Sequence, residues 1–91
     1  MVNNNLEAGE VMVKMVAKLK QLAQERHNLN IEDVDPLYRA NRADELVWQM
    51  AGIANSLIDM EDELEKFYPE LIPFLQFMVR NYPNMKYKGQ L

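Results

Sequence analysis

Apolar residues recur every three or four positions along almost the whole chain. In the first third of the sequence this set consists of Ala8, Met12, Met15, Leu19 and Leu22, widened by Val11, Val16 and Ala23. Spacings of three and four place side chains on one face of an α-helix, whereas a half-buried strand alternates at every second residue. No run of strand-like alternation or internal repeat interrupts the pattern. The sequence therefore predicts an all-α fold.

Prolines and capping residues divide this pattern into helices. Asp35 precedes Pro36, a pair typical of a helix start because aspartate accepts hydrogen bonds from free amides and proline at the first position loses none. Pro69 and Pro73 each exclude a continuous helix, since an internal proline removes an amide donor and clashes with the preceding turn. We predict a small antiparallel bundle of three to four helices, at about residues 6–27, 36–55, 57–68 and 70–81.

The continuity of the second helix depends on residues 55–59. The apolar seam runs in phase through Leu64 and Leu71, which favours one long helix. Asn55, Ser56 and Asp59 are each candidate caps for a new helix. We expect a break or kink at this point.

Length and composition indicate one domain with a single modest core, residues 1–91, with flexible ends at about 1–5 and 83–91. The absence of cysteine excludes disulfides and thiolate metal sites. The N-terminus lacks the basic and apolar regions of a signal peptide, and apolar runs of about five residues are too short to cross a bilayer. We expect a cytoplasmic protein with no membrane association.

Charge is unevenly distributed along the chain. The net charge is −4, and residues 59–66 hold five acids and one lysine, so that the remaining nine acids and nine bases balance. No acid follows Glu70, whereas Arg80, Lys86 and Lys88 make the end of the chain basic. This distribution disfavours general nucleic-acid binding, which needs a broad basic surface.

The acidic cluster has three interpretations. On a helix, Asp59, Asp62 and Lys66 lie opposite an apolar face, and Glu61, Glu63 and Glu65 lie on its flanks. The apolar face is formed by Leu57, Met60, Leu64 and Phe67. Asp62 and Lys66 would form a favourable pair one turn apart, whereas Asp59–Glu63 and Glu61–Glu65 would repel each other. The cluster is interpreted first as a solvated helix face, second as a surface that attracts a basic partner, and third as a divalent-metal site.

The sequence predicts no set of catalytic, cofactor-binding or metal-binding residues. A di-iron carboxylate bundle needs Glu-x-x-His pairs, but the single histidine, His27, follows Gln24 at that spacing and is better explained by the helix C-terminal dipole. The single serine, Ser56, is distant from His27, and the three isolated glycines form no phosphate-binding loop.

Trp48 lies off the apolar stripe of its helix, on the side of Leu37, Asp44 and Gly52. Two interpretations are open. The second helix is central and covered on both sides by its own chain, or Trp48 anchors an interface, where tryptophan is enriched. The predicted partner-binding residues are Leu37, Asp44, Trp48, Asp59, Asp62 and Glu63.

The stretch ADELVWQMAGIANSL, residues 43–57, resembles the second acidic helix of MazG-type nucleotide pyrophosphohydrolases, which are all-α and magnesium-dependent. That family holds its metal with a Glu-x-x-Glu set and a Glu-x-x-Asp set. In this chain Glu45 is followed three residues later by Trp48, and the only Glu-x-x-Glu of the first helix is Glu7 with Glu10. The resemblance covers 15 residues and lacks half of the ligand pattern, so we do not transfer the activity.

The sequence favours a non-enzymatic acidic module that binds another protein as an adaptor, inhibitor or immunity-type antagonist, and its acidic helix face suits a basic partner. We expect a homodimer through the second helix, since a small core gains from self-association. One alternative is a metal-dependent nucleotide hydrolase using Asp59, Glu61, Asp62, Glu63 or Glu45. Another is a nucleic-acid accessory protein whose tail interleaves basic and aromatic residues, namely Arg80, Tyr82, Lys86, Tyr87 and Lys88. The same tail is otherwise interpreted as a flexible end or as a strap across the bundle.

Overall fold

The computed structural model describes the backbone of residues 4–89 and 91, and the side chains of that range from Gly9 onwards. These residues form only helices and connections, so the all-α prediction is confirmed for the described part of the chain. A flexible end is expected at residues 1–5, and residues 1–3 of it lie outside the described residues. In chain order the elements are α1 (Asn4–Ile31), α2 (Pro36–Leu57), the 3₁₀ turn η1 (Ile58–Met60), α3 (Glu61–Phe67), the 3₁₀ turn η2 (Pro69–Leu71) and α4 (Ile72–Asn81).

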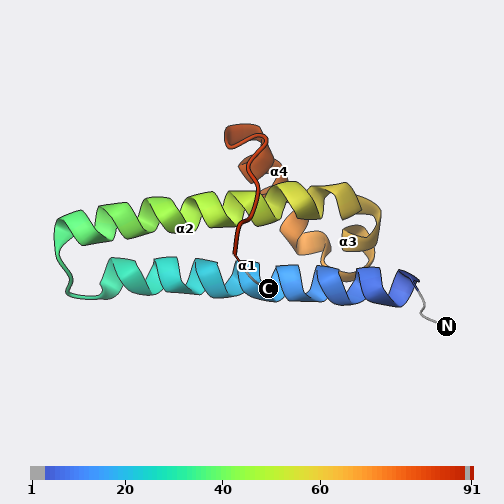
Figure 1. The fold of residues 1–91 in the computed structure, drawn as a ribbon, viewed down its shortest axis with the longest axis horizontal. Coiled ribbons are helices and arrows are strands. Elements are labelled where there is room, and N and C mark those ends of the chain that lie inside the picture. The colour runs from blue at the N-terminus through green and yellow to red at the C-terminus, as the bar shows by residue number, and fades with distance from the viewer. Residues whose placement is uncertain (1–3, 90) are drawn as a thin grey trace.

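The two long helices, α1 and α2, form a hairpin in which they lie side by side and run in opposite directions (Figure 1). Asp35 caps α2 as predicted, because its Oδ1 accepts a hydrogen bond from the Leu37 amide at 2.8 Å, and Pro36 occupies the first turn. The hairpin makes the molecule elongated, with extents of 51 × 27 × 22 Å.

Helix α1 continues to Ile31, about one turn beyond the predicted end. Leu29 extends the seam by seven residues from Leu22 and is buried, a repeat already present in the sequence. The guanidinium of Arg39 reaches back from α2, donating from Nε to the Leu29 carbonyl at 3.2 Å and from Nη2 to the Glu32 carbonyl at 2.7 Å. These bonds satisfy carbonyls that a helix end otherwise leaves unpaired.

The predicted width of the α1 stripe is partly wrong. Met12, Val16, Leu19 and Leu22 are buried, as expected. Val11 and Ala23 are exposed, because α1 packs mainly against α2 and needs only a narrow apolar seam.

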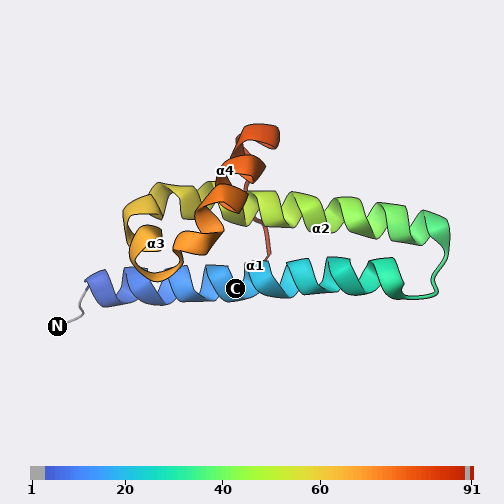
Figure 2. The same ribbon diagram turned by 180° about the vertical axis from the view of Figure 1, so that it is seen from behind.

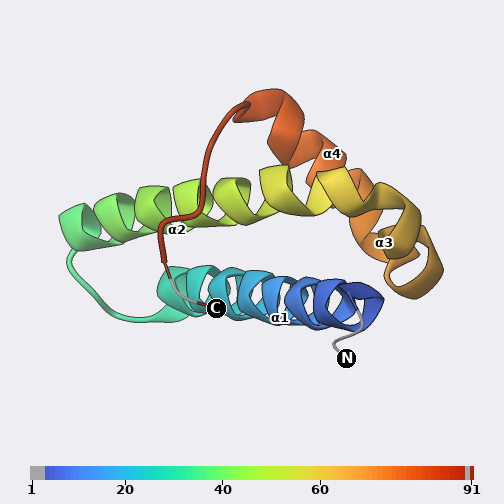
Figure 3. The same ribbon diagram turned by 45° about the vertical axis from the view of Figure 1, so that its right-hand side comes forward.

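Helices α3 and α4 cover one end of the hairpin on one face (Figure 2). Helix α4 crosses α2 and ends on the side of α2 away from α1 (Figure 3). One core cluster joins all four α-helices, and α2 contributes the largest share of it. Its buried side chains are Met12, Val16, Leu19, Leu22, Leu29, Leu46, Met50, Ala51, Ile53, Ala54, Leu57, Leu64, Leu75 and Met78.

The expected break after α2 is observed at η1, but its local cause differs from the predicted caps. The Asn55 amide donates to the Ala51 carbonyl at 2.8 Å and the Ser56 hydroxyl donates to the Gly52 carbonyl at 3.4 Å. Such bonds back to the preceding turn bend a helix rather than start a new one. Helix α3 begins after Met60 with no side-chain cap.

The C-terminal segment, residues 82–89, returns across α2 towards α1 on the face opposite α3 (Figure 1). The Asn55 amide donates to the Tyr82 carbonyl at 2.9 Å. A Cβ built on Gly52 would lie 2.5 Å from the Tyr87 nitrogen and 2.7 Å from the Lys86 carbonyl carbon. The segment therefore lies where a strap across the bundle would lie, which is one of the two interpretations of the tail. The flexibility expected at residues 83–91 stays a prediction.

Among the described residues, no helix combines the length and the apolar character that a bilayer crossing requires.

Candidate partner-binding groove

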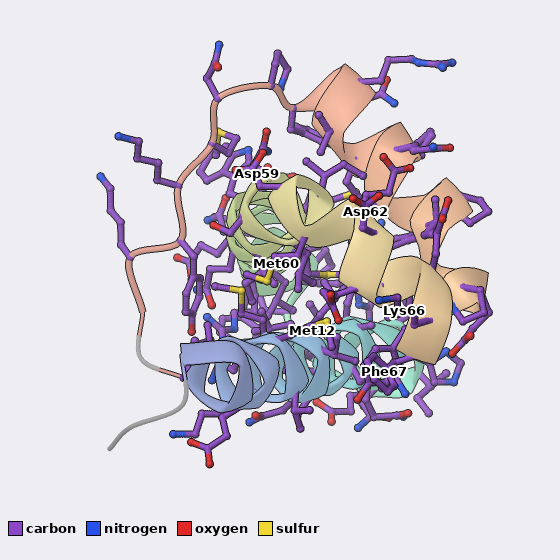
Figure 4. The ribbon with its side chains drawn as sticks, turned by 90° about the vertical axis from the view of Figure 1, so that its right-hand side faces the viewer. Met12, Asp59, Met60, Asp62, Lys66 and Phe67 are labelled. Atoms are coloured by element: carbon purple, nitrogen blue, oxygen red, sulfur yellow. The ribbon has the colours of Figure 1, made fainter. Side chains whose placement is uncertain are left out.

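An open groove of about 1130 Å³ lies at the end of the molecule, between the first half of α1 and the η1–α3 segment. We call it the end groove. Its α1 side consists of Gly9, Glu10, Met12, Val13 and Lys14, and its other side consists of Ile58, Asp59, Met60, Glu61, Asp62, Glu63, Phe67 and Tyr68. Figure 4 looks into this end, with the Met12 and Met60 side chains between α1 and η1.

The apolar lining of the end groove is accessible to a partner. Met12 is buried beneath it and Met60 is half-buried, whereas Val13 and Phe67 are 51% and 63% exposed. Sequence reasoning placed Phe67 on the apolar face of a helix spanning residues 57–68. That placement is wrong because η1 interrupts the helix and α3 ends at Phe67, where the ring lies beside α1 instead of in the core (Figure 4).

Tyr68 closes one side of the groove. Its ring lies under the Lys20 ammonium of α1, with the Nζ atom 5.6 Å from the ring centroid. At this distance a cation–π attraction contributes about 0.5–1 kcal/mol at an exposed site. The contact links the end of α3 to α1 without filling the space between them.

Three acids of this region lie together at the start of α3. Glu61, Asp62 and Glu63 form its first turn, where negative charge is favourable because the free amides of a helix N-terminus carry partial positive charge. On the continuous helix that the apolar seam favoured, the same acids would repel each other without this compensation. The 3₁₀ turn thus places three of the acids where the helix dipole favours them, while Glu61 and Glu65 still lie one turn apart within α3.

The predicted Asp62–Lys66 pair is wrong in detail. The ion pair of Lys66 is with Glu63, at 3.7 Å between Nζ and Oε1, and both side chains are largely exposed. Glu61 accepts a hydrogen bond from Gln76 of α4 at 3.4 Å. Asp59 and Asp62 form no ion pair within the described residues. Both lie along the η1–α3 edge, on the side away from α1 (Figure 4).

The structure divides the six predicted partner-binding residues into two groups. Asp59, Asp62 and Glu63 border the end groove. Trp48, Asp44 and Leu37 lie farther back along α2, all three exposed, and the Trp48 side chain is 52% exposed. Trp48 precedes Asp59 by eleven residues, which is about 16 Å along a helix.

Helix α2 is central, as one interpretation of Trp48 required, because it packs against α1 and α4 and carries the C-terminal segment. These contacts nevertheless leave half of the Trp48 ring accessible. The covering of Trp48 by its own chain, expected under that interpretation, is therefore wrong.

The groove residues that sequence reasoning missed are Met12, Val13, Phe67 and Tyr68. The signal for Val13 was the run Val11-Met12-Val13, since three consecutive apolar residues span more of a helix than one buried face requires. The positions of Phe67 and Tyr68 depended on the break at η1, so no local pattern could have indicated them.

The proposed hydrolase ligands do not converge. Glu45 is bound to Arg42 at 2.9 Å, and Arg42 is also bound to Glu25 at 2.6 Å. The hydrogen bonds that Arg42 donates, first to Glu25 and then to Glu45, raise the pKa of Arg42 above its already high value, so the guanidinium remains charged at ordinary pH. Among the described residues, no three His, Asp or Glu side chains are placed to hold a metal ion together.

The remaining candidates for chemistry are also separated. His27 is exposed and lies before the last turn of α1, which corrects its predicted place against the helix C-terminus. The Ser56 hydroxyl is bound to its own helix. In the basic tail, Tyr82 and Tyr87 are half-buried against the core cluster, so their rings are less available for stacking on nucleic-acid bases.

Comparisons with protein families, with curated proteins and with solved structures return no match to this chain.

Proposed function

We propose that this chain is a non-enzymatic protein-binding module of the cytoplasm, an adaptor, inhibitor or immunity-type antagonist, whose partner binds in the end groove. The observation that carries the proposal is the combination of an open apolar groove with a row of carboxylates along one edge. Interfaces are recognised by apolar anchors that exclude water and by a polar rim.

The two parts of this surface would act differently. Burying Val13, Met60 and Phe67 would supply affinity, at about 25 cal/mol for each Å² of apolar surface removed from water before the costs of association. The carboxylates would raise the rate of encounter with a basic protein and disfavour acidic ones. Because the rest of the chain is neutral overall, the negative potential concentrates at this end.

We further propose that the module is a homodimer that associates through the exposed face of α2 around Trp48 and Leu37. This face is about 16 Å from the end groove along α2, so a second copy could bind there while the groove remains open. Tryptophan is among the residues most enriched at the energetic centres of interfaces.

The groove is tested by affinity capture from the native host followed by mass spectrometry, with matched variants of the bait. Phe67→Asp places a charge in the groove, and Phe77→Asp makes the same change at a similarly exposed ring on α4. We expect one partner to be retained by wild type and by Phe77→Asp and depleted at least about tenfold by Phe67→Asp. Retention of every captured protein by Phe67→Asp would contradict the proposal.

A further inference from the structure

We infer that the ligand of the end groove is a single amphipathic α-helix of another protein, carrying basic residues along one flank. This inference rests on the proposed function and names the class of its partner. It follows from the size of the groove, the backbone that surrounds it and the unequal charge of its two sides.

The size of the groove matches a short helical segment. An α-helix about 10–12 Å across and rising about 5.4 Å per turn occupies roughly 400–600 Å³ per turn. The groove has a volume of about 1130 Å³ and is open to solvent, so it has room for the apolar face of a short helix whose opposite face remains outside. Two turns present apolar side chains at spacings of three and four to one surface, which is the pattern by which helices bind in apolar grooves.

The surrounding backbone favours a helix over an extended peptide. An extended ligand gains affinity by pairing with the edge of a sheet, and the described residues contain no strand. Both sides of the groove belong to helical segments, whose backbone groups are paired within each segment apart from the termini. A helical ligand satisfies its own backbone hydrogen bonds and requires only side-chain contacts from the groove.

The charge of the two sides sets the orientation of the ligand. The η1–α3 side carries Asp59, Glu61, Asp62 and Glu63, whereas the α1 side carries Glu10 together with Lys14. Glu61 and Glu63 already contact Gln76 and Lys66, which leaves Asp59 and Asp62 as the carboxylates for recognition. Because both lie on the outer side of the η1–α3 edge (Figure 4), the long side chains of lysine or arginine on the ligand can reach them by extending over that edge, with their alkyl stems on the apolar lining.

The apolar lining suits the bulky anchors of such a helix. Met60 lies half-buried between α1 and η1, near the buried Met12 (Figure 4), and its unbranched side chain can adapt to leucine or phenylalanine of different shapes. Phe67 provides a rigid ring at the far side of the groove. The anchors of the ligand helix pack between these groups.

The test uses a fluorescein-labelled synthetic peptide of about 14 residues, with leucines at spacings of three and four and lysines on one adjoining flank. Matched peptides carry glutamate in place of lysine, or the same residues in an order without an apolar face, and a proline-rich peptide represents the extended class. Binding is followed by fluorescence anisotropy. Circular dichroism of each protein variant confirms that its helices are retained.

The expected result is binding of the basic amphipathic peptide that is weakened on the order of tenfold or more by the double variant Asp59→Asn/Asp62→Asn and by Phe67→Asp. The control double variant Glu65→Gln/Glu70→Gln, which removes two exposed acids outside the groove lining, should bind within about twofold of wild type. The peptide with glutamate in place of lysine and the peptide without an apolar face should both bind at least about tenfold more weakly than the basic amphipathic peptide.

Equal binding of the basic peptide by wild type and by the groove variants would overturn the inference, as would preferential binding of the proline-rich peptide in the groove. If no helical peptide binds while affinity capture still depends on Phe67, the class of ligand is wrong and the proposed function stands. If neither peptide binding nor affinity capture depends on Phe67, both are wrong.

Discussion

At the residue scale, Gly52 is the position where the identity of one side chain decides a tertiary contact. It is buried in the interior of α2, five residues before the end of that helix, where glycine costs about 1 kcal/mol of helix stability relative to alanine. The C-terminal backbone at Lys86 and Tyr87 occupies the space where a Cβ would lie. The absence of a side chain therefore allows the strap to lie directly on the helix.

Gly52→Ala is expected to destabilise the protein by about 1–3 kcal/mol, because overpacking against backbone outweighs the gain in helix propensity. The matched control is Gly9→Ala in α1, where an added Cβ meets nothing within 4 Å, and this variant should be more stable by about 0.5–1 kcal/mol. Urea unfolding measures both changes. A Gly52→Ala variant as stable as wild type would show that the strap does not lie on α2.

At the scale of elements, α3 depends on the rest of the fold. It has seven residues, and isolated helices shorter than about 12 residues are marginal in water. The acidic first turn and Lys66 in the last turn favour it locally. Its one buried side chain, Leu64, joins it to the core. Because α3 forms one side of the end groove, the groove exists only while Leu64 is packed.

Leu64→Ala should reduce the free energy of unfolding by about 2–5 kcal/mol, since it leaves a cavity at a fully buried leucine. Amide hydrogen exchange should lose protection across residues 61–67 before it does so in the α1–α2 hairpin. Glu65→Ala, at an exposed position of the same helix, should change stability by less than about 0.5 kcal/mol. Uniform loss of protection over the whole chain would contradict this local role.

At the scale of the whole molecule, the long hairpin is covered over only part of its length. Helices α3 and α4 pack at one end, and the strap crosses near the middle (Figures 1 and 2). Leu37 and Tyr38 near the other end are 69% and 55% exposed, and Trp48 is exposed between them and the strap. This distribution of apolar surface is the basis for the proposed homodimer.

Trp48→Ala is expected to weaken self-association on the order of tenfold or more, because tryptophan anchors contribute upwards of about 2 kcal/mol at interface centres. Sedimentation equilibrium across a range of concentrations measures the effect, and circular dichroism should show unchanged helicity. Phe77→Ala, which truncates an exposed ring on α4, is the control and should leave association unaltered. A monomeric wild-type protein would rule out the homodimer.

The sequence by itself determined the helical class, the start of α2 at Asp35–Pro36 and most of the buried positions of α1. These features depend on periodicity and on capping within a few residues, so they can be predicted without knowledge of distant contacts. Where such signals conflicted, at residues 55–59, the sequence allowed both a continuous helix and a break.

The tertiary structure alone decided the position of the strap on Gly52, the exposure of Trp48 and Phe67, and the formation of the end groove. Each of these depends on residues far apart in the chain, such as Gly52 with Tyr87 or Met12 with Met60. Local propensity cannot predict such contacts. They form only after the ends of the helices, the angle of the break and the packed faces have together fixed where each segment lies.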